Sequence, residues 1–157
     1  MPLIRIQLVT NRFNPVSAAI RLRTASEFSH IEFVNLTDQT TLGSRSIGGV
    51  KIRPCAKDHY SRVEQFTFSG IEKAYEWGLT QIGKPYDFSG IAGILFNHDW
   101  TNDKRWFCAD FIQMASIKGP FNPLLSTRPS NFIAHYTPRD FLLSRTLVYV
   151  EKGAPWI

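Results

Sequence analysis

An alternation of apolar and polar positions opens the chain and predicts a β-strand over residues 3–10. Ile4, Ile6 and Leu8 fall on one face of this strand, and polar residues interrupt the other face. A second strand is expected over residues 28–35. Turn residues separate further segments that we predict as strands, at residues 40–47, 50–53, 63–68 and 146–151. Short turns between the earlier of these strands favour a small antiparallel meander.

Spacings of three and four residues predict helices between and after the strands. Asn14 followed by Pro15 is typical of a helix start, and Ser69 with Glu72 predicts a capping box for a helix that ends at Gly83. The other predicted helices cover residues 88–95, 108–118 and 138–143, and an irregular segment is expected over 121–136. The pattern predicts one α+β domain over residues 1–157, a mostly antiparallel sheet packed against helices.

Composition and charge exclude a disordered chain and argue against a nucleic-acid partner. Hydrophobic residues make up 43% of the chain and charged residues 20%, which excludes a disordered chain. The net charge of +5 comes from dispersed lysines and arginines, with no run of five like charges. We therefore expect a solvated basic surface and no nucleic-acid partner. Nucleic-acid binding stays a third hypothesis, based on the charge and the aromatic residues alone.

Targeting signals are not evident in the sequence. The N-terminal segment is interrupted by Arg5 and Gln7, so it does not resemble a signal peptide, and a cytoplasmic location is the default expectation. No stretch reaches the roughly 18 apolar residues of a membrane-spanning helix. We therefore expect no membrane span.

The two cysteines and the histidines are the candidates for chemistry. Cys55 and Cys108 are too few for a disulfide framework. Cys55 precedes His59 by four residues, but a structural zinc needs about four ligands, so we expect no metal and no other cofactor. His98 and His135 lie in predicted loops, where solvated side chains are the usual explanation.

Cys108 and His30 form the strongest candidate pair. Cys108 begins a predicted helix, where unpaired amides and the positive end of the helix dipole favour a thiolate. His30 lies on a predicted strand, which would hold an imidazole rigidly enough to take the thiol proton. The alternative is that Cys108 is an ordinary core residue, since free cysteines are among the most buried residue types.

Three segments carry a family resemblance. Residues 29–34 (SHIEFV), 83–88 (GKPYDF) and 106–111 (WFCADF) resemble, in that order, motifs of circularly permuted papain-fold proteins. These are the NlpC-type, YiiX-like cysteine hydrolases, which are distantly similar to lecithin:retinol acyltransferase. The resemblance covers residues 3–118 and implies a permuted papain-like (NlpC-type) fold.

The resemblance also implies roles for individual residues. It implies that Cys108 is the nucleophile, that His30 is the general base and then the general acid, and that an acyl-enzyme is formed. The tyrosine of the second motif, Tyr86, is implied to contribute a phenol to the substrate site. The alternative for Tyr86 is a packing role beside the turn, and Asp87 is expected to cap the following helix.

The third catalytic residue departs from the family pattern. The family places a polar residue, often Glu, on the strand after the histidine, but residues 41–46 contain no acid. Ser44 holds the family position, and Gln39 and Glu32 are the alternatives. We place Ser44 first, because Glu32 lies about 6.5–7 Å from the histidine along the same strand and is awkward as its orienter.

The resulting functional hypothesis is a cysteine peptidase, amidase or esterase of a bacterial or phage protein. The first choice of substrate is a cell-wall (peptidoglycan) peptide, followed by a small amide or ester. Without a signal peptide, a wall-directed role needs another exit route, such as phage-associated release. The alternative is a catalytically inactive domain on the same scaffold that binds a peptide, glycan or protein partner.

Overall fold

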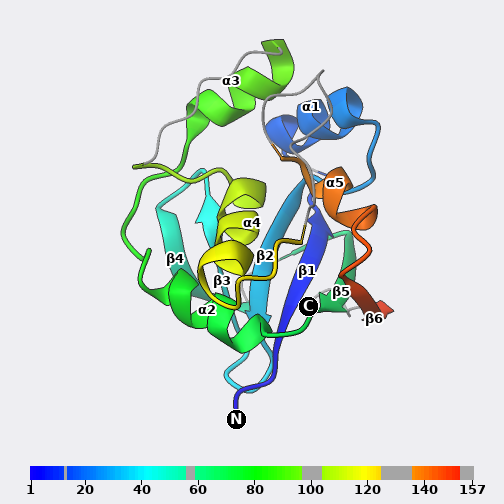
Figure 1. Ribbon diagram of the computed structural model, residues 1–157. Helices are drawn as coiled ribbons and strands as arrows, with labels where there is room; N and C mark the ends of the chain where they lie inside the picture. The colour runs from blue at the N-terminus through cyan, green and yellow to red at the C-terminus, as the bar shows by residue number, and fades with distance from the viewer. Residues whose placement is uncertain (13, 56–58, 97–103, 125–135, 153–157) are drawn as a thin grey trace.

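Six antiparallel strands form one sheet in the computed structural model, which describes residues 1–12, 14–55, 59–96, 104–124 and 136–152 (Figure 1). The strand order is β4-β3-β2-β1-β5-β6. The strands are β1 (Ile4–Thr10), β2 (His30–Asn35), β3 (Thr40–Arg45), β4 (Gly49–Pro54), β5 (Arg62–Thr67) and β6 (Val148–Lys152). Each strand pairs with its neighbours in the antiparallel sense, so β2, β3 and β4 form the predicted meander.

The described helices are α1 (Pro15–Thr24), α2 (Ile71–Leu79), α3 (Phe88–Phe96), α4 (Cys108–Lys118) and α5 (Pro138–Leu142). Helix α4 packs against β2 and β3, and α2 packs against α4 and the sheet, so both cover the same face (Figure 1). Helices α1 and α3 contact each other near one end of the sheet. The prediction of an α+β fold with a mostly antiparallel sheet is confirmed.

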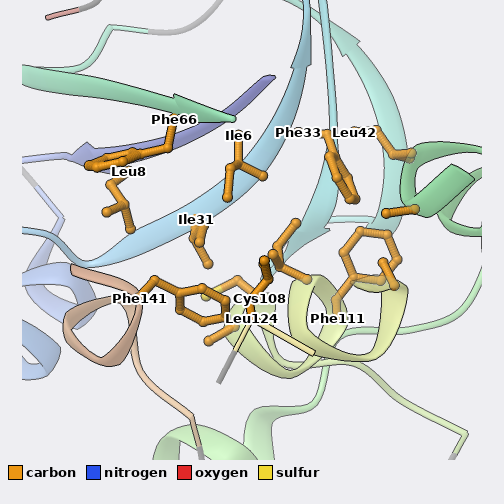
Figure 2. Close-up of a cluster of buried hydrophobic side chains, with 14 of the residues drawn as sticks. Ile6, Leu8, Ile31, Phe33, Leu42, Phe66, Cys108, Phe111, Leu124 and Phe141 are labelled. Carbon is orange, nitrogen blue, oxygen red and sulfur yellow. The ribbon is translucent and has the colours of Figure 1, made fainter. Parts of the chain in front are cut away.

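The core lies between the sheet and α4. Ile31 and Phe33 project from β2 toward the helix, and Phe111 projects from α4 to meet them (Figure 2). The Phe33 and Phe111 rings pack edge to face, with their centroids 6.1 Å apart. Each fully buried side chain of this size contributes about 1.5–3 kcal/mol to folding. The alternation along β2 therefore directs Ile31 and Phe33 into the core and leaves His30 and Glu32 for the other face.

Helix starts were predicted correctly with one exception. Asn14 caps α1, its side chain accepting from the amide of Val16 at 2.9 Å. The capping box predicted at Ser69 and Glu72 is wrong, because α2 begins at Ile71 behind Gly70, which has a φ of 83°. A Cβ on Gly70 would lie 2.4 Å from the Cβ of Pro120, so a close tertiary contact determines this helix start.

Some expectations fall outside the described residues, namely the loops carrying His98 and His135 and most of the irregular segment predicted over residues 121–136. Within the described part of the chain, every helix is too short or too polar to span a bilayer.

Candidate active site

His30 and Glu32 contact each other on β2. They lie two residues apart, so their side chains leave the same face of the sheet, and His30 Nε2 lies 3.1 Å from Glu32 Oε2. The backbone positions of the two residues are far apart along the strand, which made Glu32 look awkward as a partner. The long Glu32 side chain covers this distance and reaches the imidazole. Placing Ser44 before Glu32 as the partner of His30 was therefore wrong.

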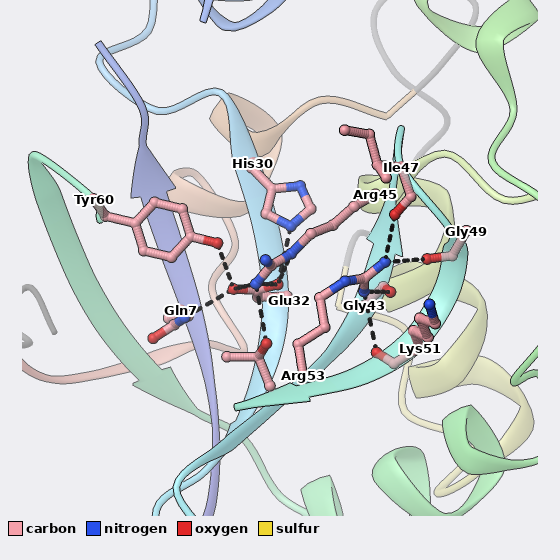
Figure 3. A network of polar contacts seen from close by, with 11 residues as sticks. Gln7, His30, Glu32, Gly43, Arg45, Ile47, Gly49, Lys51, Arg53 and Tyr60 are labelled. Carbon is pink, nitrogen blue, oxygen red and sulfur yellow. Dashed lines mark hydrogen bonds and ion pairs between the residues drawn. The ribbon is translucent and has the colours of Figure 1, made fainter. Parts of the chain in front are cut away.

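Glu32 is a buried carboxylate with several donors around it (Figure 3). Its side chain has no exposed surface. Arg45 Nε donates to Oε2 at 3.0 Å, while Gln7 Nε2 and the Tyr60 hydroxyl donate to Oε1 at 2.9 and 3.0 Å. Burial raises the pKa of this carboxyl, but the charges of Arg45 and His30 and the hydrogen bonds from His30 and Gln7 hold the pKa well below its usual range. Glu32 is therefore an anion that is available to support a charged imidazole.

Gly43 on β3 makes room for this carboxylate. A Cβ added to Gly43 would lie 2.7 Å from the Cβ of Glu32, which is closer than real side chains approach. A glycine at this position therefore lets Glu32 lie against the neighbouring strand. No local sequence signal marks this role, since it depends on the pairing of β2 with β3.

Cys108 is the first residue of α4, as predicted. The preceding residue, Phe107, has extended backbone angles and no side-chain hydrogen bond to the helix end. The first amides of the helix therefore point toward the region of the thiol without a capping side chain. Asp110, in the same turn, accepts from the amide of Tyr136 at 3.3 Å. Cys108 itself is only 1% exposed and packs within the core (Figure 2).

The structure brings Cys108 and His30 together. Burial lowers the pKa of His30, but the charges of Cys108 and Glu32, and side-chain hydrogen bonds to both, raise it to about 9. Because Nε2 faces Glu32, Nδ1 is the ring nitrogen left for the thiol. His30 thus connects a carboxylate on its own strand with a thiol at a helix start.

Ser44 has a different partner from the one predicted. Its hydroxyl donates to the backbone carbonyl of Trp106 at 2.6 Å, and its side chain is buried. The same carbonyl accepts from the amide of Asp87 at 3.1 Å. Ser44 thereby ties β3 to the segment that leads into Cys108.

Tyr86 lies near the thiol. Its side chain is largely buried, and burial together with the charges of Cys108, Asp87 and Asp110 raises its pKa well above the ordinary value. The prediction that Asp87 caps a helix is confirmed, since its carboxylate accepts from the amide of Ser89 at 3.0 Å. The charge of Cys108 acts on this phenol, and its contact with a substrate stays a prediction.

A cavity of about 290 Å³ opens beside the site. His30, Arg45, Tyr60 and Tyr86 line it, together with residues of α1. Among the described residues, no Asp, Glu or Cys belongs to the lining of this cavity. The cavity is close to the lower end of the size range of small-molecule sites, which begins at about 300 Å³.

Sequence reasoning missed three partners of Glu32. Gln7, Arg45 and Tyr60 come from β1, β3 and the segment before β5, and each reaches the carboxylate through the pairing of strands. The alternation placed Gln7 on the polar face of β1, which is the one signal that could have found it. Gln39 was the third alternative for supporting His30, and its backbone carbonyl accepts from the amide of Cys55 at 2.9 Å.

Comparison with known proteins identifies the fold. No family model and no curated protein matches the sequence. The solved structure of the metalloprotein YiiX from Escherichia coli O157:H7 (DUF1105) is similar, with a TM-score of 0.70 and 20% sequence identity. The match covers 98% of this chain and 99% of that chain. The chain therefore has a YiiX-like α+β fold, as the resemblance predicted.

Because YiiX is a metalloprotein, the metal-binding capacity of this site matters. Among the described residues, no three or more His, Cys, Asp or Glu side chains form a group that could hold a metal ion. Both oxygens of Glu32 already accept hydrogen bonds from Arg45. Cys55 is buried whereas His59 is exposed beside the cavity. The described side chains therefore do not fit a metal ion.

Proposed function

We propose that this protein is a cysteine-dependent hydrolase of amides or esters, with Cys108, His30 and Glu32 as its catalytic residues. The observation that carries the proposal is that the imidazole of His30 contacts a buried carboxylate at 3.1 Å and lines a cavity, while the charge of the thiol at the start of α4 raises its pKa. This arrangement has the nucleophile, base and orienting group of a catalytic triad.

The first half of the reaction forms an acyl-enzyme. His30 holds the proton that leaves the Cys108 thiol, and the sulfur attacks the substrate carbonyl carbon to form a C–S bond. In this proposal, backbone amides at the start of α4 donate to the oxyanion that develops. When the tetrahedral intermediate collapses, the C–N or C–O bond breaks and His30 donates its proton to the leaving group.

The second half releases the acyl group. His30 takes a proton from water, the resulting hydroxide attacks the thioester carbon, and the C–S bond breaks. The proton returns to the sulfur, and a carboxylic acid leaves. Throughout, the Glu32 carboxylate contacts Nε2 of His30, which fixes the ring and supports its positive charge.

The substrate class follows from the same proposal. We infer a permuted papain-like relationship from the order of the motifs, in which the histidine strand precedes the cysteine helix. Within that class, a peptidoglycan stem peptide is our first substrate and a small amide or ester our second. The net charge of +5 is compatible with an anionic cell-wall polymer.

One observation favours a second candidate function. Cys108 is 1% exposed and is not among the residues that line the cavity, as expected for a domain that binds a peptide, glycan or protein partner without catalysis. In that case the cavity would be the binding site and Cys108 a packing residue.

Alkylation of Cys108 by iodoacetamide as a function of pH separates the two functions. Cys55→Ser leaves Cys108 as the single thiol, and adding His30→Ala tests the pairing. Catalysis predicts rapid labelling well below about pH 8.5, the ordinary thiol value, and loss or displacement of this labelling without His30.

Slow labelling that rises only near about pH 8.5, and that is indifferent to His30, would contradict the proposal and favour the binding domain. Labelling in urea controls for burial of the thiol, and circular dichroism checks the fold of each variant. A positive result directs the next assays to peptidoglycan fragments and simple esters.

A further inference from the structure

Arg45 shares the carboxylate of Glu32 with His30. Its Nη2 donates to Oε1 at 3.0 Å and to Oε2 at 2.9 Å, and its Nε donates to Oε2 at 3.0 Å. The same Oε2 lies 3.1 Å from Nε2 of His30. One oxygen atom therefore contacts both the guanidinium and the imidazole (Figure 3).

The Arg45 guanidinium is itself held in place. Its Nη2 donates to the hydroxyl of Thr41, four residues earlier on β3, at 3.0 Å. The ring of Tyr60 lies 5.8 Å from the guanidinium carbon, within the range of a cation–π contact. Arg45 also lines the cavity beside His30, with its side chain 20% exposed.

We propose that Arg45 is a positioning residue of this site: its guanidinium fixes the Glu32 carboxylate and, through that carboxylate, the orientation and charge of the His30 imidazole. This inference rests on the function proposed above, because it gives His30 a role in proton transfer. Neither the motifs nor the fold comparison points to an arginine at this position.

Two cations compete for one buried anion at this site. Among the described residues, Arg45 and His30 are the cationic groups that contact Glu32, while Gln7 and Tyr60 donate to it as neutral groups. Without Arg45, the full charge of Glu32 would act on His30, which would then hold its proton more tightly. Arg45 therefore keeps the imidazole able to release the proton that catalysis requires.

Other titratable groups face His30 as well, and they remain in every variant below. Cys108 faces it from the start of α4, Glu32 from its own strand, and His59, Tyr60 and Tyr86 line the same cavity.

Arg53 on β4 provides a matched control. Its guanidinium donates to the backbone carbonyls of Ile47, Gly49, Gly43 and Lys51, at 2.8–3.2 Å (Figure 3). Arg53 thus supports the β3–β4 turn. Replacing it removes an arginine of the same sheet that donates to these four backbone carbonyls.

The experiment is an NMR titration of the His30 ring protons, with their assignment taken from His30→Ala; the chain has 4 histidines. We expect Arg45→Gln to raise the titration midpoint of His30 by about one pH unit. This is the size of effect expected when a nearby positive charge, which disfavours protonation of the imidazole, is removed. Arg45→Lys restores the charge and should bring the midpoint back toward the wild type. Arg53→Gln should leave it unchanged.

An unchanged midpoint in folded Arg45→Gln overturns the proposal, and so does an equal rise in Arg53→Gln. If Arg45→Gln does not fold, Thr41→Val takes its place, because it removes one hydrogen bond that holds the guanidinium. The titration midpoint of His30 must then rise by a smaller amount, and an unchanged midpoint overturns the proposal. Failure of the proposed function is distinct, because it would appear as Cys108 alkylation that does not depend on His30, whatever the Arg45 variants do.

Discussion

The raised pKa of His30 predicts that the stability of the protein depends on this residue in a defined pH window. The folded-state pKa is about 9 and the ordinary value is 6.5. Because the folded protein holds the proton more tightly, the stabilisation is fully present below pH 6.5 and is lost as the pH rises through 9. The difference between these values corresponds to about 3 kcal/mol. The side chain is only 18% exposed, so solvent screening removes little of this.

The measurement is urea unfolding of the wild type and His30→Ala at several values between about pH 6 and pH 10. Subtracting the two free energies of unfolding cancels the groups that titrate in the same range and do not interact with His30, such as lysines far from the site. We expect the charge-dependent part of the difference, about 3 kcal/mol, to be present near pH 6 and to vanish near pH 10. In a Glu32→Gln background this part should be smaller, because one of the charges that raises the pKa is gone.

A difference between wild type and His30→Ala that stays constant over the whole range would refute the reasoning. His30 would then contribute packing alone, and neither Glu32 nor Cys108 would stabilise its charged form. A difference that grows with pH would mean that the pKa of His30 is lowered in the folded protein. The effect of burial would then outweigh the effects of Glu32 and Cys108.

Two further predictions concern how β3 supports the site. Gly43→Ala should lower the free energy of unfolding by about 1–3 kcal/mol, because the added methyl group would lie 2.7 Å from the Cβ of Glu32. An unchanged urea unfolding curve would mean that β2 and β3 can move apart at this point without loss of stability. Ser44→Ala should cost about 1 kcal/mol, because it leaves the Trp106 carbonyl without its 2.6 Å hydrogen bond. It should also slow alkylation of Cys108, and an unchanged rate would show that the tie does not position the thiol.

The hydrophobic pattern was sufficient to predict most elements of the fold. The alternation of residues 3–10 and 28–35 matches β1 and β2, and the predicted bounds of the 108–118 helix are those of α4. These predictions succeeded because each depends on local periodicity and on nearby helix or turn signals. The start of α2 failed because Pro120, 50 residues from Gly70 in the sequence, determines the local backbone there.

The site was predictable only as far as its local signals reached. A cysteine at a helix start and a histidine on a strand are visible in one sequence, so Cys108 and His30 could be chosen as candidates. The surroundings of Glu32 depend instead on strand register: Gln7 lies directly opposite Glu32 because β1 pairs with β2 in one particular alignment. Estimating distance from strand rise alone also misjudged Glu32, since it ignored the length of the side chain.

The buried charges themselves favour a catalytic interpretation over a purely structural one. Replacing a buried ion pair by apolar residues of similar volume is often neutral or stabilising, so such a pair is weak evidence for a role in stability. Val9 and Val34, on the same face of β1 and β2, are fully buried apolar residues, so this face accommodates apolar side chains. A domain that used this region for packing alone would have no need of a carboxylate, a guanidinium and an imidazole in contact. Proton transfer at Cys108 would use such a group of charges, because the carboxylate supports the charged imidazole, and for that reason we favour the hydrolase over the binding domain.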